Sequence, residues 1–304
     1  MKDKILKIME YLNKGLVDKE DIMKAGLLTL LAKENIILLG PPGTAKSEIA
    51  RRLSNVIKGG NYFEYLLTKF TTPEELFGPL SIKSLKNDEF HRNTQGYLPD
   101  SNVVFLDEIF KANSSILNSL LTIINEKKYH NGREKMDVPL ISLVGASNEY
   151  PGSEELEALY DRFLIKKKVG YISGEKRNEL FELTGENGLI PEELKITVEE
   201  IEEIQKEYQR VKLPKEIINI VLNIADMYME ELKDNKKERI SDRKLVKLSK
   251  LLKISAYTNG REEVNLSDVF LLKECLWNDY ENGERIEAII RSEVSRGKIV
   301  DFSS

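Results

Sequence analysis

The sequence contains 304 residues, 41% of them hydrophobic and 32% charged, so it is long enough to bury a sizeable core and to divide into two domains. Its formal net charge of -5 arises from acidic and basic residues interspersed along the chain, which gives no electrostatic reason to expect a nucleic-acid partner. The longest purely apolar runs span only a few residues, so neither a membrane span nor a secretory signal is indicated, and we expect a cytoplasmic protein.

The cysteine and histidine content argues against thiol chemistry and against a zinc site. Cys275 is the single cysteine, so it cannot form an internal disulfide, and its apolar neighbours indicate a buried, unreactive thiol. His91 and His130 lie in polar, turn-rich surroundings without a Cys or His at ligand spacing. Catalysis, if present, must therefore rest on other side chains.

The first half of the chain changes from helical to strand patterns. Apolar residues at helical spacing predict a helix that includes Ile5 and Leu12, followed by a turn at 15–17 and a second helix through Leu31. Short apolar runs at 36–39, 103–106 and 141–144 are then separated by helical patterns. Such runs are typical of strands buried on both faces of a parallel sheet, so we predict an α/β fold.

Helical patterns take over beyond about residue 173, where such apolar runs disappear. We therefore predict two domains, an α/β core over residues 1–172 and an all-helical domain over residues 173–304.

A glycine- and proline-rich loop follows the first predicted strand. It reads Gly40-Pro41-Pro42-Gly43-Thr44-Ala45-Lys46-Ser47, and an amphipathic pattern begins directly after it. This is the context of a P-loop, whose backbone N–H groups and helix N-terminus hold phosphates while Lys46 reaches the β- and γ-phosphates and Ser47 ligates Mg²⁺. Ala45 departs from the usual pattern, which has glycine before the lysine. We expect the nucleotide to be bound by Pro42, Gly43, Thr44, Ala45, Lys46, Ser47, Glu48 and Asp107.

The second predicted strand, 103–106, ends in two acidic residues. Asp107 is expected to hold Mg²⁺ together with Ser47, and Glu108 is expected to orient and deprotonate the attacking water. A strand followed by Asp-Glu is by itself also a common helix-capping loop. The functional interpretation therefore depends on its pairing with the P-loop.

The third predicted strand leads to Asn148, which places a polar amide where the carboxyl edge of a parallel sheet carries ligands. Such an amide could position water beside the γ-phosphate. An asparagine at a strand end is otherwise most often a turn residue, so this interpretation also rests on the order of the three elements.

A P-loop at 40–47, an acidic strand end at 103–108 and a strand-ending Asn148, in that order, resemble the AAA+ superfamily of ATPases. The segments 70–80 and 158–163 resemble signatures of the MoxR family, and with Ser241-Asp242-Arg243 they point to its RavA branch. The resemblance covers nearly the whole chain. It implies a parallel five-stranded sheet flanked by helices, followed by a small all-α lid.

The resemblance also assigns roles to three further residues. Asn148 matches sensor 1, Arg162 matches the arginine finger that acts in the ATP site of a neighbouring subunit, and Arg243 matches sensor 2 of the lid. The implied catalytic set is therefore Lys46, Glu108, Asn148, Arg162 and Arg243, with ATP, ADP and Mg²⁺ as ligands. Without the resemblance, both arginines would be interpreted as surface ion-pair residues.

Two insertions fit the same family. Residues from about 80 to 97 look like a helix-2 insert, and residues from about 129 to 139 resemble a hairpin before sensor 1, with Asn131-Gly132 as its tight-turn pair. In related proteins these hairpins face the axis of a ring. The alternative, which the sequence leaves open, is that both are ordinary surface hairpins. The turn at 15–17 occupies the place where the superfamily packs against adenine.

The resemblance implies an ATPase that assembles as a hexameric ring and remodels or helps mature a client, with a von Willebrand factor A domain protein as partner. Two alternatives remain open at this stage, a nucleotide-gated scaffold with negligible turnover and a nucleic-acid-dependent motor. RavA-like proteins carry a further C-terminal region that recruits partners. This sequence stops soon after the expected lid, so that mode of recruitment is not expected of these residues.

Overall fold

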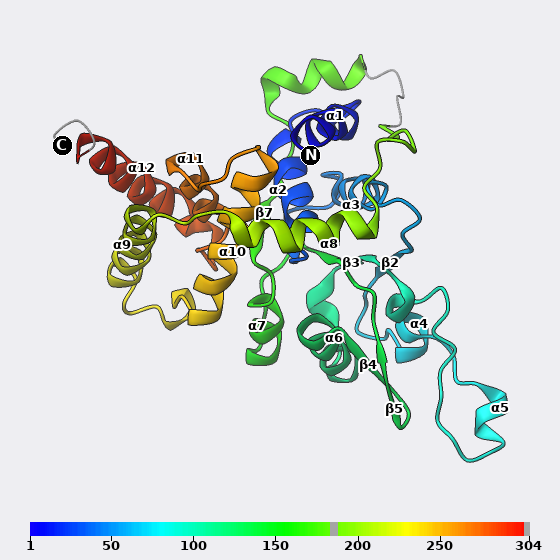
Figure 1. The fold of residues 1–304 in the computed structure, drawn as a ribbon. Helices are drawn as coiled ribbons and strands as arrows, with labels where there is room; N and C mark the ends of the chain where they lie inside the picture. Colours follow the sequence, from blue (N-terminus) through cyan, green and yellow to red (C-terminus); the bar gives the residue numbers. More distant parts are fainter. Residues whose placement is uncertain (183–187, 301–304) are drawn as a thin grey trace. The chain divides into compact units, whose positions relative to one another are not determined.

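The computed structural model of the chain describes residues 1–182 and 188–300, which fall into two compact units (Figure 1). The first unit comprises residues 8–163 and 167–198, and the second comprises residues 1–7, 164–166 and 199–304. The first unit thus continues beyond residue 172, where we placed the boundary between the two domains. That boundary stays a prediction.

The chain contains a five-stranded sheet in the order β2-β3-β6-β1-β7, of which β2, β3, β6 and β1 belong wholly to the first unit. The pairs β1–β6, β3–β6 and β2–β3 are parallel, and the middle strands are buried on both faces, as their apolar runs predict. The α/β class and the parallel sheet are therefore confirmed. The five strands are β1 (Ile36–Leu39), β2 (Tyr62–Leu66), β3 (Val103–Asp107), β6 (Ser142–Ser147) and β7 (Ile165–Lys168).

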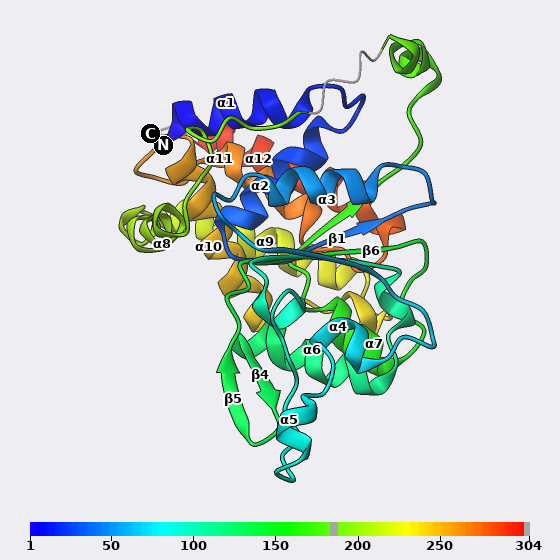
Figure 2. The ribbon, with the colours of Figure 1, turned by 90° about the vertical axis from the view of Figure 1, so that its right-hand side faces the viewer.

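Helices cover both faces of this sheet. In Figure 2, which shows the sheet edge-on, α2 and α3 lie above it and α4, α6 and α7 lie below it. Asn113 begins α6 by accepting a hydrogen bond from the Ile116 N–H at 3.2 Å, and a capping box at Thr72 begins α4. The bounds are α1 (Lys2–Asn13), α2 (Glu20–Leu31), α3 (Lys46–Ser54), α4 (Pro73–Phe77), α6 (Ser114–Glu126) and α7 (Glu154–Tyr160).

From Val198 to Val300 the named elements are all helices, joined by turns, as the sequence predicts. Within the second unit, α12 packs on α9, and Tyr228 of α9 donates a 2.7 Å hydrogen bond to the buried carboxylate of Glu238. The helices are α8 (Val198–Glu207), α9 (Lys215–Glu231), α10 (Asp242–Thr258), α11 (Leu266–Val269) and α12 (Gly283–Val300). Short 3-10 helices connect elements throughout the chain at η1 (Leu98–Asp100), η2 (Ile109–Lys111), η3 (Gly174–Phe181), η4 (Tyr208–Arg210), η5 (Lys236–Glu238), η6 (Phe270–Glu274) and η7 (Tyr280–Asn282).

The two insertions of the first unit form separate projections. The segment 80–97 carries α5 (Ile82–Leu85) and is closed by an antiparallel bridge between Leu80 and Arg92. The second projection is an antiparallel hairpin of β4 (Lys128–Asn131) and β5 (Glu134–Asp137). This hairpin overlaps the range of about 129–139 in which we expected one.

The tight turn of the hairpin differs from our prediction. Asn131 pairs with Glu134 in the ladder, so the two loop residues are Gly132 and Arg133, and the positive φ of 65° belongs to Gly132. The prediction of Asn131-Gly132 as the turn pair was therefore wrong by one residue. The physical reason is that the Asn131 side chain makes hydrogen bonds to the backbone of Arg92, outside the turn.

Asn131 joins the hairpin to the segment 80–97. Its buried side chain accepts a hydrogen bond from the Arg92 N–H at 2.7 Å and donates one to the Arg92 carbonyl oxygen at 3.0 Å. A Cβ added at Gly132 would lie 2.0 Å from the carbonyl oxygen of Phe90. The two projections are therefore in direct contact through their backbones.

Gly132→Ala should loosen this contact. Gly96 is a matched control, because it also has a positive φ, of 78°, but a Cβ there would meet nothing within 4 Å. We expect Gly132→Ala to lower the free energy of unfolding by about 1–3 kcal/mol more than Gly96→Ala does, measured by denaturant unfolding, since only the former overpacks. Hydrogen exchange should also quicken in residues 80–97 for Gly132→Ala alone. Equal effects of the two substitutions would show that the contact contributes nothing.

Candidate functional site

The carboxyl edge of the sheet gathers the ends of the three strands that the sequence analysis singled out. Leu39 pairs with Ser147, and the Gly40 N–H donates a 3.0 Å hydrogen bond to the Ser147 carbonyl oxygen. Asp107 ends β3, which adjoins β6. The P-loop, the acidic pair and Asn148 therefore leave the sheet at one edge, from neighbouring strands.

The P-loop is an unusually tight turn from β1 into α3. Gly43 and Ala45 both have left-handed backbones, with φ of 77° and 68°. A Cβ at Gly40 would lie 2.0 Å from the Val169 carbonyl oxygen, whereas the space beside Gly43 is open. Ala45 is the N-cap of α3 and makes no side-chain capping bond, so the first turn of α3 offers its N–H groups to a ligand.

Lys46 lies between this loop and the acidic pair. Its buried ammonium donates hydrogen bonds of 2.8 Å and 2.9 Å to the carbonyl oxygens of Gly40 and Pro41. Burial lowers the pKa of Lys46, and the negative charges of Asp107 and Glu108 act in the opposite direction. The structure therefore brings Lys46, Asp107 and Glu108 together, as the sequence analysis expected.

The acidic pair has a constrained backbone. Glu108 adopts a left-handed conformation with φ of 52°, and its N–H donates a 2.9 Å hydrogen bond to the Asp107 carboxylate. The Glu108 carboxylate lies 3.3 Å from the Lys111 ammonium. A non-glycine residue in this backbone region is strained, and such strain is concentrated at functional sites.

The remaining predicted nucleotide and sensor residues are placed as follows. Ser47 lies in the first turn of α3, half-buried, directly after Lys46. Glu48 binds Arg52 of the same helix at 2.7 Å. Thr44 is buried and donates a 2.9 Å hydrogen bond to the Pro41 carbonyl oxygen, which stabilises the loop. Asn148 follows β6 directly and is exposed.

The two predicted arginines lie on other elements. Arg162 follows α7, and its guanidinium donates a 2.7 Å hydrogen bond to the Asn125 side chain and contacts the Asp161 carboxylate at 3.3 Å. Arg243 is exposed in the first turn of α10, in the second compact unit. The trans role of Arg162 and the sensor role of Arg243 stay predictions.

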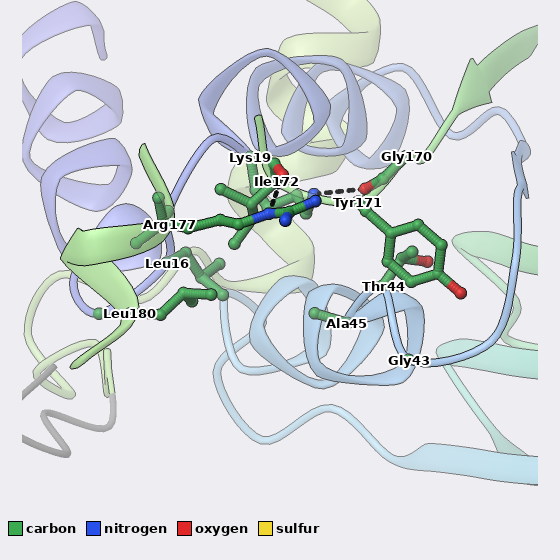
Figure 3. Close-up of a pocket in the computed structure, with 12 residues that line it drawn as sticks. Leu16, Lys19, Gly43, Thr44, Ala45, Gly170, Tyr171, Ile172, Arg177 and Leu180 are labelled. Carbon is green, nitrogen blue, oxygen red and sulfur yellow. Dashed lines mark hydrogen bonds between the residues drawn. The ribbon is translucent and has the colours of Figure 1, made fainter. Parts of the chain in front are cut away.

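A cavity of about 470 Å³ adjoins the P-loop (Figure 3). Gly43, Thr44 and Ala45 form one wall, and the turn at 15–17 forms another. That this turn packs against adenine stays a prediction. Apolar side chains of Leu16, Val17, Ile172 and Leu180 give the cavity the character of a pocket for a flat, mostly apolar group.

Several residues that line this cavity escaped the sequence analysis. They are Lys19, Gly170, Tyr171, Ile172, Arg177 and Leu180. Lys19 donates a 3.0 Å hydrogen bond to the Gly170 carbonyl oxygen, and Tyr171 donates one of 3.4 Å to the Pro42 carbonyl oxygen. The segment 170–180 is far from the P-loop in sequence and carries no motif. The only signal in the sequence was the end of the short apolar runs near Gly170 to Gly174, just after β7.

The tight phosphate loop, the adjoining acidic strand end and the cavity beside them define a P-loop nucleotide-binding domain on a parallel α/β sheet. A family model of the MoxR domain in MoxR–vWA–β-propeller ternary systems matches residues 3–206, and a model of an AAA lid domain matches residues 216–290. The chain therefore belongs to the MoxR family of AAA+ ATPases. Its place in the RavA branch stays a prediction.

Individual relatives agree with this assignment. The uncharacterized protein MJ0079 of Methanocaldococcus jannaschii is 45% identical over 92% of this chain and 71% of its own length. The chaperone MoxR1 of Mycobacterium tuberculosis is 29% identical over 54% of this chain and 44% of its own length. The crystal structure of a candidate ATPase from Cytophaga hutchinsonii has the same fold, with a TM-score of 0.74 and 20% identity, covering 95% of this chain and 94% of the other. Among the described residues, no helix is long and apolar enough to cross a membrane.

The left-handed backbone at Ala45 gives a direct test of the loop. Ala45→Gly removes the Cβ that disfavours this conformation, so we expect ADP binding to be kept. Ala45→Val adds β-branching at the same φ and should weaken ADP binding at least about tenfold, measured by calorimetry, because strain of about 1–3 kcal/mol is added. Equal affinities for the valine and glycine variants would contradict this view of the loop.

Proposed function

We propose that this chain hydrolyses ATP to ADP and phosphate in a ring-shaped oligomer and uses the turnover to remodel or help mature partner proteins. The observation that carries the proposal is the position of Lys46, between the carbonyl oxygens of the P-loop and the carboxylates of Asp107 and Glu108. A binding-only module has no need of a general base beside its phosphate loop.

The residues at the sheet edge fit a magnesium nucleotide. Open space beside Gly43 and the uncapped first turn of α3 offer backbone N–H groups to a polyphosphate. Lys46 would turn its ammonium from the backbone carbonyls to the β- and γ-phosphates. Ser47 and Asp107 supply the oxygen ligands that Mg²⁺ prefers, and bound Mg²⁺ would neutralise charge on the phosphates.

Hydrolysis then depends on two further side chains at the same edge. Glu108 would accept the proton of the attacking water, and its constrained backbone fixes the direction from which its carboxylate approaches. Asn148, one residue beyond β6, would hold that water beside the γ-phosphate. Because the backbones of β3 and β6 are hydrogen-bonded neighbours, the spacing between these two groups is set by the sheet.

Arg162 and Arg243 would complete the site in the assembled ring. We propose that Arg162 acts on the ATP of a neighbouring subunit in a ring, which the family resemblance makes hexameric, and that Arg243 acts from the lid on its own subunit. The described bonds of Arg162 to Asn125 and Asp161 hold its guanidinium near the protein surface, where its side chain is 18% exposed. Arginine is suited to this task because it stays charged and binds phosphate oxygens in pairs.

The proposed partner is a von Willebrand factor A domain protein. The matching family model describes MoxR domains from ternary systems that contain such a protein and a β-propeller. The name of the relative MoxR1 describes that protein as a chaperone. Together these findings support a role in which nucleotide turnover acts on another protein.

Glu108→Gln separates turnover from binding. The variant keeps the size and hydrogen bonding of the side chain but cannot accept a proton, so kcat should fall by about 10²–10⁴ while the Kd for ATP changes less than about threefold. Phosphate release and calorimetry measure the two quantities. As a control, Glu20→Gln alters an exposed ion pair with Lys24 and should leave both unchanged. Unaltered turnover in Glu108→Gln, or a wild-type protein that binds but never hydrolyses ATP, would favour the nucleotide-gated scaffold.

Mixing two inactive variants tests whether sites are shared between subunits. Arg162→Ala should abolish turnover with ATP binding retained, because the stabilising charge for the neighbour's phosphate is lost. A mixture of Arg162→Ala with Glu108→Gln should regain part of the wild-type phosphate release, since some sites then combine an intact Glu108 with an intact Arg162. Arg210→Ala, which removes another surface arginine, is the control. Absence of any recovery in mixed oligomers would rule out action in trans.

A further inference from the structure

The cavity beside the P-loop contains a buried cation that the proposed chemistry of hydrolysis does not use. Lys19 is only 5% exposed, and among the described residues its ammonium makes one hydrogen bond, to the Gly170 carbonyl oxygen at 3.0 Å. An ammonium has three donors. Burying it with spare donors is costly unless a ligand supplies acceptors; burial lowers the pKa of Lys19, and the negative charge of the neighbouring Asp18 offsets only part of that effect.

A second cation lines the same cavity. Arg177 projects from η3, and its Nε donates a weak 3.4 Å hydrogen bond to the Ile172 carbonyl oxygen. Figure 3 shows its guanidinium reaching across the cavity toward Lys19. The ion pair of Lys176 with Asp18, 2.7 Å long, connects η3 to the turn that precedes α2. Two like charges thus face one space, which favours an occupant with a strong acceptor edge.

The cavity is too apolar elsewhere to suit a polyanion. Leu16, Val17, Ile172 and Leu180 line it, and its end at Gly43–Ala45 meets the phosphate loop. A purine base attached to phosphates held by that loop would lie between these apolar walls. Lysine and arginine donors suit the O6 and N7 acceptors of a 6-oxopurine, a pairing frequent in guanine recognition.

Adenine has a different set of partners in the same cavity. The carbonyl oxygens of Gly170 and Ile172 each have a second lone pair, so either can accept the exocyclic amine of adenine. Donors for one class of base and acceptors for the other are therefore both present.

We propose that Lys19, assisted by Arg177, is a specificity-determining residue that binds the acceptor edge of 6-oxopurines, so that the site accepts guanine and inosine nucleotides in addition to adenine nucleotides. This inference rests on the proposed function, because it requires the cavity to hold the base of a nucleotide whose phosphates lie on the P-loop. It extends that function by naming the class of bases and the side chain that selects among them.

The test is the binding of ADP, GDP and IDP to the full chain, measured by calorimetry without turnover. The wild-type protein should bind GDP and IDP within about tenfold of ADP. Lys19→Met keeps the length and apolar stem of the side chain but removes its donors, so it should weaken GDP and IDP binding about 10- to 100-fold and ADP binding less than about threefold. Lys19→Arg should keep GDP binding, since its donors remain.

Controls separate a specific effect from misfolding and from failure of the proposed hydrolysis. Lys24 lies on α2, the helix that Lys19 precedes, and its side chain is 57% exposed and outside the residues that line the cavity, so Lys24→Met should change no affinity. Unchanged thermal melting of Lys19→Met would show that the fold is kept. Absence of GDP binding in the wild-type protein, or equal loss of GDP and ADP binding in Lys19→Met, would overturn the proposal. If the wild-type protein binds GDP and ADP with the predicted ratio of affinities but hydrolyses no ATP, only the proposed ATPase function would be contradicted.

Discussion

The turn from β1 into α3 is the constraint on which the candidate site depends. Gly40 lies so close to the Val169 carbonyl that no side chain fits, and the chain must then reverse through two left-handed residues before α3 begins. Lys46 stabilises this turn by donating hydrogen bonds to the carbonyl oxygens of Gly40 and Pro41. Since β1 pairs directly with β6, which in turn pairs with β3, the geometry of the turn fixes the distance from the phosphate loop to every other polar group at the edge.

Strained backbone occurs on both sides of this edge. Ala45 in the loop and Glu108 after β3 are both non-glycine residues with positive φ. Each conformation costs of order 1–3 kcal/mol, which the surrounding sheet and helices must offset. The Asp107 carboxylate accepts a hydrogen bond from the Glu108 N–H, which stabilises the backbone of Glu108. On the other side, the buried Lys46 directly follows Ala45. The backbones that carry the acidic side chain and the ammonium are therefore both constrained where they leave the sheet.

The sequence predicted the strands and the motif residues because their signals are local. Buried apolar runs gave β1, β3 and β6, and the order of Lys46, Asp107 and Asn148 along the chain gave the edge at which they meet. Lys19 and Arg177 were not predicted, since their proximity depends on the segment after β7 folding back beside the turn at 15–17, and no spacing within either segment encodes it. Asn131 was assigned to the turn because Asn-Gly pairs usually form turns. Its amide was instead used by Arg92, a long-range partner that local propensity does not reveal.

The bond between Asn131 and Arg92 has a consequence for how the two projections respond to force. Separate hairpins would bend independently, each against its own base. Because one buried amide binds both backbone groups of Arg92, and Gly132 lies against Phe90, we expect the segment 80–97 and the hairpin to be displaced together. Since β4 packs on α6, a displacement of either projection would also bear on that helix.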